Sequence, residues 1–309
     1  MEQRLLGRYE GKAAGPLLLC IGAMHGNEPA GVEAIRQLFE LLEYEPVQNP
    51  GFIYRGNVVG LIGNLSALRE KKRFMERDLN RMLSMDEVDR ILSVLPEKRA
   101  PEELECIELI NSVQAEIDRY KPEETLILDF HTTTADGGIF TICAEDSVSR
   151  DLAMGLFAPV ILGLAEILPG TTIGYFNRPT LRQYCIVFEA GQHNDPECVH
   201  RSVAAVVNCM RSIGSVNPHD VDHRHDGLLI RLSIGLPKMT QLIHHYKIQP
   251  GENFIMNPGY ENFQKIEAGE FLANNNSGNV ISPVTGLILM PKYQSQGDDG
   301  FFIVENLDL

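Results

Sequence analysis

The sequence predicts an α/β protein, in which a largely parallel or mixed sheet carries helices on its faces. Three observations lead to this class. Over the first two thirds of the chain, short apolar segments typical of strands alternate with amphipathic segments typical of helices. The 309 residues, 44% of them hydrophobic, can form a sizeable core in one large or two unequal domains. From about Leu228 onward, short apolar segments between Gly, Pro and Asn residues predict a small β domain.

Five segments in the first part of the chain are expected to form strands of the main sheet. Each is a short apolar run, which is the pattern of a strand that is buried on both faces. The five segments are 17–23, 57–62, 125–130, 138–143 and 185–188.

Four amphipathic segments are expected to form helices between and after these strands. The clearest is 101–120, where apolar residues recur at helical spacing and Pro101 suits the first turn. Segment 29–42 also begins with a proline at a suitable first helical position. The other two helices are predicted at 149–167 and 196–213.

A change of character near Pro218 divides the chain into two expected domains, 1–225 and 226–309. In the second domain, segments 259–273 and 280–290 resemble the hairpins of a compact barrel. The stretch 222–226, with the sequence DHRHD, offers side chains that bind metals, but its position favours a solvated linker. The same interpretation is preferred for the pair His244 and His245.

Charge and composition exclude several classes of partner. A net charge of −15 argues against binding to nucleic acid or to an anionic membrane. No apolar run approaches a membrane span and the N-terminus does not resemble a signal peptide, so a cytoplasmic location is expected. Six scattered cysteines without CxxC spacing predict buried thiols in a reducing compartment. The sequence leaves open whether the chain forms a homo-oligomer.

The spacing that carries most information is formed by His25 and Glu28, followed 103 positions after Glu28 by His131. Two ligands three residues apart and a distant third are typical of catalytic zinc, because three protein ligands leave one coordination position open. Both groups follow apolar strands, and strand ends are the usual location of sites in open α/β sheets. Alternatively, His25 and Glu28 cap a helix and His131 is a core histidine. The joint occurrence favours one zinc per chain.

Residues 69–81 concentrate basic side chains in an otherwise acidic protein. Lys71 and Lys72 are interpreted as solvated. Arg73, Asn80 and Arg81 are suited to binding an acidic small molecule, because a guanidinium group binds a carboxylate with two hydrogen bonds and an amide can orient it.

Glu189 ends a third apolar strand segment. A carboxylate beside the zinc can act as a general base and then return the proton to a leaving amine. The alternative interpretation is an ordinary ion pair with a nearby Lys or Arg.

Four motifs together resemble those of the succinylglutamate desuccinylase/aspartoacylase family, a branch of the zinc carboxypeptidase-like (M14-like) hydrolases. The resemblance covers residues 15–195 in order and spacing, and the C-terminal part is also similar. The motifs are GAMHGNE (22–28) for the first zinc ligands, RDLNR (77–81) for substrate, DFHT (129–132) for the third ligand and FEAG (188–191) for the catalytic glutamate.

The resemblance implies that zinc binds to His25, Glu28 and His131 and that Glu189 activates the attacking water. It further implies that Arg73 polarises the amide carbonyl and that Asn80 and Arg81 hold a substrate carboxylate. The implied fold is an α/β/α sandwich with a mixed sheet, over which a small C-terminal β domain closes.

The sequence also departs from the aspartoacylase pattern. Thr132 occupies a position where aspartoacylases have Asn, which is closer to the desuccinylase branch. Pro179 replaces an aspartoacylase arginine and is flanked by Arg178 and Arg182. The tail 291–300 differs too, so a substrate contact by Tyr293 is left open, as are the acyl group and the amine.

The resulting hypothesis is a cytoplasmic zinc-dependent amidohydrolase that removes the acyl group of an N-acyl amino acid or a similar small acidic amide. One alternative is a metallocarboxypeptidase that acts on short peptides. A second alternative is a metal-binding module without catalysis, although such a module would not need a general base.

Overall fold

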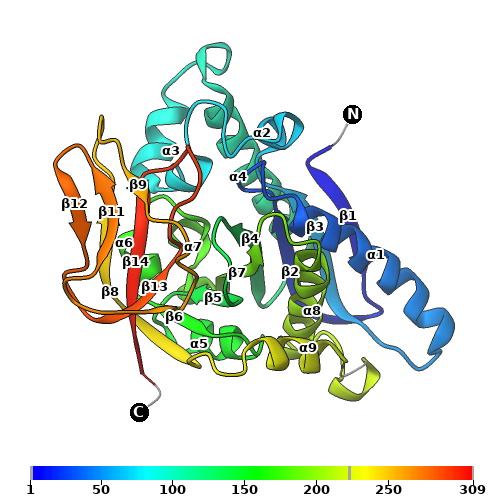
Figure 1. Ribbon diagram of the computed structural model, residues 1–309. Helices are drawn as coiled ribbons and strands as arrows, with labels where there is room; N and C mark the ends of the chain where they lie inside the picture. The colour runs from blue at the N-terminus through cyan, green and yellow to red at the C-terminus, as the bar shows by residue number, and fades with distance from the viewer. Residues whose placement is uncertain (1–2, 222–223, 308–309) are drawn as a thin grey trace.

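The computed structural model describes residues 3–221 and 224–307, which form a mixed sheet between two groups of helices (Figure 1). The main sheet has eleven strands in the order β1-β3-β2-β4-β7-β5-β6-β8-β14-β13-β10. They are β1 (Leu5–Glu10), β2 (Ala13–Gly22), β3 (Arg55–Ile62), β4 (Thr125–Thr133), β5 (Phe140–Cys143), β6 (Val160–Leu162), β7 (Gln183–Gln192), β8 (Met239–Lys247), β10 (Lys265–Ile266), β13 (Gly286–Leu289) and β14 (Asp299–Asn306). The predicted sandwich with a mixed sheet is confirmed, and all five predicted strands are present.

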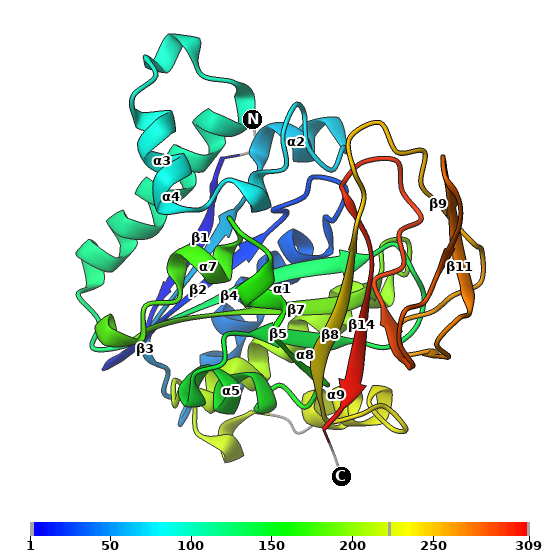
Figure 2. The ribbon, with the colours of Figure 1, turned by 90° about the vertical axis from the view of Figure 1, so that its left-hand side faces the viewer.

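Helices cover both faces of the central strands (Figure 2), and alternate residues of these strands pack against different helix layers. Leu18 and Cys20 of β2 belong to the core beneath α1 and α8, whereas Leu19 and Ile21 belong to the core beneath α3 and α4. All four side chains are fully buried. Since both faces are covered, the strands are continuously apolar, which explains why they could be recognised from the sequence.

The long helices begin and end close to where the pattern predicts them. Helix α4 has the predicted bounds, α8 differs by one residue at each end, and α1 continues six residues further. Among the described residues, no helix combines the length and apolarity needed for a membrane span. The helices are α1 (Ala30–Gln48), α2 (Leu65–Glu70), α3 (Met85–Leu92), α4 (Pro101–Tyr120), α5 (Ser147–Met154), α6 (Leu164–Ile167), α7 (Thr172–Phe176), α8 (Glu197–Ser212) and α9 (Arg224–Leu232).

The predicted helix over 149–167 is wrong. This segment contains α5, the short buried strand β6 and α6. Pro159 disfavours helix at the preceding residue, and Gly163 adopts a φ of +85° that ends β6. Val160 and Ile161, which fall within the predicted helix, instead lie fully buried in the sheet.

The interpretation of 222–226 and of His244-His245 as solvated linker is also wrong where the structure describes them. Residues from Arg224 onward form α9, whose Leu229 is buried against α8, and Asp226 accepts a hydrogen bond from Arg211. Asp222 and His223 lie outside the described residues. His244 and His245 belong to β8.

The C-terminal residues continue the main sheet, because β8 pairs in parallel with β6 and β14 pairs with β8. A separate antiparallel sheet has the order β12-β11-β9 and comprises β9 (Ile255–Met256), β11 (Phe271–Asn275) and β12 (Gly278–Ile281). The two predicted hairpins are wrong in their pairing: β11 and β12 form the hairpin, and β10 pairs with β13. Gly278, with a φ of +117°, permits the turn. The domain boundary at 225 remains a prediction.

The register of the parallel strands brings three chain segments to one edge of the sheet. Gly22 at the end of β2 is the partner of Phe130 in β4, and His131 in β4 is the partner of Glu189 in β7. The polar residues that follow or end these strands therefore lie together.

The loop before the 3-10 helix at Leu79–Arg81 is held by a buried carboxylate. Glu102, in the first turn of α4, is fully buried and accepts hydrogen bonds from the backbone N–H groups of Met75 (2.6 Å), Glu76 (3.1 Å) and Arg77 (3.3 Å). This loop carries Arg73 and Asp78, so Glu102 connects α4 to the position of both side chains.

Replacing Glu102 by Gln is expected to lower the free energy of unfolding by about 1–3 kcal/mol, because at least one backbone N–H would face the new NH2 group without an acceptor. Urea denaturation measures the change. Glu97→Gln, at an exposed position, is the matched control. Equal stability of the two variants would show that Glu102 does not hold the loop.

Candidate active site

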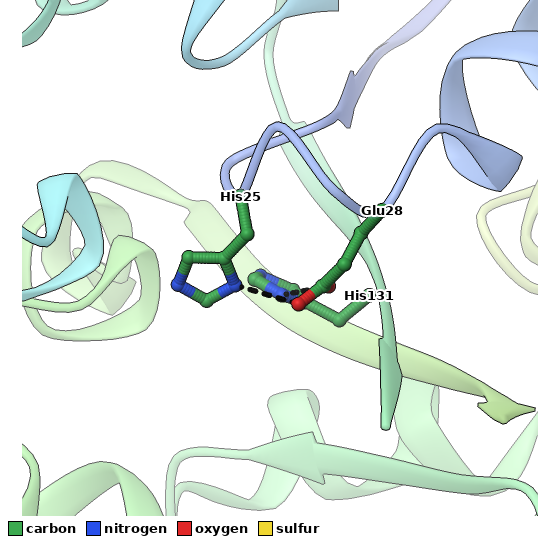
Figure 3. A group of neighbouring side chains, drawn as sticks. All are labelled: His25, Glu28 and His131. Carbon is green, nitrogen blue, oxygen red and sulfur yellow. Dashed lines mark hydrogen bonds and ion pairs between the residues drawn. The ribbon is translucent and has the colours of Figure 1, made fainter. Parts of the chain in front are cut away.

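The predicted metal ligands lie together (Figure 3). His25 and Glu28 come from the loop between β2 and α1, and His131 comes from β4. The Glu28 carboxylate lies between the two rings, with Oε1 3.0 Å from His25 Nδ1 and Oε2 3.1 Å from His131 Nδ1. One potential ligand atom from each residue lies within 4.8 Å of the others.

The loop between β2 and α1 needs a glycine at position 26. A side chain there would place its Cβ only 2.0 Å from the carbonyl carbon of Ala67. The Gly26 amide also donates to the carbonyl oxygen of Arg73 (3.2 Å), and the Glu28 amide donates to that of His25 (3.1 Å). The backbone therefore fixes the two ligands of this loop relative to each other and to the loop of Arg73.

The second nitrogen of each histidine meets another carboxylate. His25 Nε2 lies 3.1 Å from Asp78 Oδ1, and His131 Nε2 lies 3.0 Å from Asp129 Oδ2. Carboxylates in this position orient histidine ligands and increase their basicity in metal sites. Two imidazole nitrogens and a carboxylate with these partners are a donor set that suits catalytic zinc.

The charges of this cluster shift the pKa values of its members. Burial acts to raise the pKa of Glu28, but His25 and His131 outweigh it and hold the pKa well below its usual range. Burial acts to lower the pKa of His131, but Asp129 and Glu28 outweigh it and hold the pKa well above its usual range. A carboxylate at position 28 is therefore strongly favoured.

Glu189 is the ladder partner of His131 and is buried. Its Oε2 has no hydrogen-bond partner among the described residues. No described Lys or Arg lies at ion-pair distance from the Glu189 carboxylate. Burial raises the pKa of Glu189 to about 8; His131 lowers it, while Glu28 raises it further. The surface ion pair considered above is therefore not what the structure contains.

Arg73 and Asp78 form a rigid pair next to the ligands. Arg73 Nη2 and Nε lie 3.0 and 3.2 Å from Asp78 Oδ2, and Arg73 Nη1 lies 3.6 Å from Glu28 Oε1. Burial acts to raise the pKa of Asp78, but His25 and Arg73 hold it well below its usual range. Asp78 thus fixes both the guanidinium group and one ligand ring.

Asn80 and Arg81 lie in the short 3-10 helix that follows. Asp78 Oδ1 caps this helix by accepting from the Asn80 amide (2.9 Å), and Asn80 Oδ1 accepts from the Thr172 amide (3.1 Å). Arg81 donates to the carbonyl oxygen of Asn80 (2.6 Å) and to the carboxylate of Asp299 in β14. Asp299 therefore joins the C-terminal strands to the predicted substrate-binding residues.

A single cavity contains all seven predicted site residues. Arg178, Arg182 and Tyr293, which stand where the sequence departs from the aspartoacylase pattern, do not line this cavity. Arg178 packs over the ring of Tyr175, Arg182 pairs with Glu124, and the Tyr293 hydroxyl bonds to the backbone at positions 257 and 260. The residues brought together are His25, Glu28, Arg73, Asn80, Arg81, His131 and Glu189.

Comparison with known proteins identifies the relationship. The family described as "Succinylglutamate desuccinylase/Aspartoacylase catalytic domain" matches residues 14–210, more than half of the chain. The protein belongs to the succinylglutamate desuccinylase/aspartoacylase family. The predicted family is confirmed.

Individual members of the family are distant in sequence. A probable aspartoacylase of Acaryochloris marina is 27% identical over 132 residues, which span 42% of this chain and 39% of that protein. The match therefore covers well under half of the relative's length.

Solved structures establish the shared fold. The product-bound ectoine utilization protein EutE of Ruegeria pomeroyi superposes with a TM-score of 0.65 at 16% identity, over 97% of this chain and 88% of that protein. The succinylglutamate desuccinylase of Chromobacterium violaceum gives a TM-score of 0.64 at 18% identity, over 100% and 95%.

Several residues of this family member's site were not singled out from the sequence. Asp78 and Asp129 belong to the motifs RDLNR and DFHT, and this was the only feature of the sequence that could have indicated their place in the site. His193 Nδ1 and Thr132 Oγ1 share a hydrogen bond (2.7 Å). The buried Nε2 of His193 has no partner among the described residues. Asp299 reaches the cavity from β14 and Lys292 from the segment between β13 and β14, and no local pattern marked either residue.

His131→Ala is expected to reduce bound zinc to near zero, because it removes one of three ligands. Elemental analysis after zinc loading and desalting measures the content. His200→Ala, on the exposed face of α8, is the control and should retain about one zinc per chain. Stoichiometric zinc in His131→Ala would show that the metal binds elsewhere.

Proposed function

We propose that this protein is a zinc-dependent hydrolase that cleaves the amide bond of an N-acyl amino acid or a similar small acidic amide. The observation that supports this most is the buried Glu189 carboxylate. It is the strand neighbour of His131, lines the same cavity as the three ligands, and has an oxygen without a partner among the described residues. A protein that only bound metal would have no use for such a group.

His25, Glu28 and His131 would hold the zinc. When bound, zinc supplies a Lewis acid that polarises the scissile carbonyl and lowers the pKa of water. Asp78 and Asp129 would keep the two imidazole rings in position, because each accepts a hydrogen bond from the nitrogen that faces away from Glu28.

Glu189 would act as the proton carrier. Its carboxylate would accept a proton from the attacking water and deliver it to the departing nitrogen. Burial and the neighbouring carboxylates favour the protonated form of Glu189, so the proton could be held between these two events. A nearby divalent cation would lower this pKa towards neutral pH.

Arg73, Asn80 and Arg81 would position the substrate. Asp78 directs the Arg73 guanidinium towards the ligand set, where its remaining N–H groups can donate to the carbonyl oxygen as negative charge develops. Two of the five N–H groups of Arg81 donate to the Asn80 carbonyl oxygen and to Asp299, so others can donate to a substrate carboxylate beside Asn80.

The cellular setting proposed is the cytoplasm. The six cysteines, all buried and free, are compatible with a reducing compartment, as the sequence predicted.

A turnover screen tests the substrate class. The zinc-loaded protein is offered N-acyl amino acids and dipeptides, and release of the free amine is measured. Preferential hydrolysis of N-acyl amino acids is expected. Preferential hydrolysis of dipeptides would instead indicate a metallocarboxypeptidase.

Glu189→Gln is expected to keep its zinc and to lower kcat by on the order of a hundredfold or more, because the amide cannot accept the proton. Turnover and metal content are measured on one preparation, so that loss of metal is not mistaken for loss of the base. Turnover within a few-fold of the original protein at full zinc content would remove Glu189 from the mechanism.

A further inference from the structure

The arginine and lysine side chains that line the cavity are Arg73, Arg81 and Lys292. Two of them already have carboxylate partners. Arg73 bonds to Asp78, and Arg81 bonds to Asp299. The positive charge that these arginines could offer to a substrate is therefore largely balanced before any substrate arrives.

A second hydrogen bond to Asp299 supports its pairing with Arg81. Asp299 Oδ1 lies 2.8 Å from Nε2 of His245, which comes from the neighbouring strand β8. Burial acts to raise the pKa of Asp299, but the hydrogen bond from His245 and the charge of Arg81 outweigh it and lower the pKa to about 2. Asp299 is consequently an anion at neutral pH, and Arg81 and Asp299 together add no net charge.

Lys292 differs from both arginines. It follows β13 in the segment that leads to β14, is half-buried, and has no carboxylate within ion-pair distance in the described parts of the chain. Its backbone N–H donates to the carbonyl oxygen of Gly300 (2.9 Å), and the preceding Pro291 accepts from Thr134 Oγ1 (3.1 Å). The segment is thus fixed to β14 and to the end of β4, and Lys292 is held at the cavity.

The positive charge of Arg73 also acts on Lys292. Burial lowers the pKa of Lys292 and the positive charge of Arg73 lowers it further, while the charge of Asp298, which pairs with Lys247, raises it. Two cations of one cavity that repel each other provide a site where an anion would reduce the repulsion.

We propose that Lys292 is a specificity-determining residue that binds the carboxylate of the substrate and provides the net positive charge that the Arg81–Asp299 pair lacks. This inference rests on the proposed function, since it names the group that selects an anionic amide for that cavity. The ligand class is a small molecule with a free carboxylate, and Arg81 contributes hydrogen bonds without net charge.

Succinate is the probe, because its binding can be measured without turnover. Isothermal titration calorimetry compares the zinc-loaded original protein with Lys292→Gln and Lys292→Arg. Lys292→Gln is expected to weaken succinate binding by about tenfold or more, the usual scale for one hydrogen bond to a charged group. Lys292→Arg should retain most of the affinity. Lys265→Gln, on exposed β10 outside the cavity, is the control and should bind as the original protein does.

A compensating substitution separates loss of charge from damage to the fold. In the Lys292→Gln background, Asp299→Asn removes the balancing anion, so the charge of Arg81 becomes available and succinate affinity should partly return. Thermal unfolding verifies that the variants are folded.

Kinetics connect the binding result to the reaction. For an N-acyl amino acid, Lys292→Gln should raise KM about tenfold with little change in kcat, whereas the corresponding C-terminal amide should be unaffected. Unchanged succinate binding in Lys292→Gln, or no succinate binding by the original protein, would overturn the inference. Failure of the original protein to hydrolyse any N-acyl amino acid would overturn the proposed function, while the succinate titration would still test Lys292.

Discussion

The parallel register of β2, β4 and β7 is the constraint on which the site depends. It sets His131 beside Glu189 and brings the end of β2, with the loop of His25 and Glu28, to the same edge. A shift of one residue in β4 would turn His131 to the opposite helix layer, because neighbouring residues of a strand face opposite sides. The apolar residues that alternate between the two cores therefore also determine the geometry of the ligands.

Around this edge, buried or half-buried aspartates hold the predicted site residues in position. Asp78 contacts both His25 and Arg73, Asp129 contacts His131, and Asp299 contacts Arg81. Glu189 differs from these acids, since its carboxylate has no side-chain hydrogen bond or ion pair with another described residue, and its Oε2 is buried without a partner. This contrast supports the proposal that Glu189 is the reacting group and that the paired acids position its neighbours.

The sequence was informative wherever a feature was local. Continuous apolar runs revealed the buried central strands, and helical spacing with Pro101 gave the bounds of α4. The seven predicted residues of the site lie next to recognisable strand ends or within a short basic segment, and the structure places all of them in one cavity. Their individual roles remain proposals.

Features that depend on distant pairing were not accessible in this way. The strand β6 has only three residues, and its apolar residues fit a helix equally well until β5 and β8 are placed beside it. Likewise, His245 looks like a solvated histidine in the sequence, because its partner Asp299 lies 54 positions away. Lys292 gains significance only when the arginines of the cavity are found to be paired.

The bond between Arg81 and Asp299 joins residues that are 218 positions apart in the chain. Contacts of such high sequence separation form slowly, because most of the intervening chain must first be ordered. The cavity is therefore incomplete in any folding intermediate that lacks β14, even if the three metal ligands are already assembled. In the proposed mechanism, metal binding would need only the ends of β2 and β4, whereas selection of the substrate would also need β14 and the segment before it.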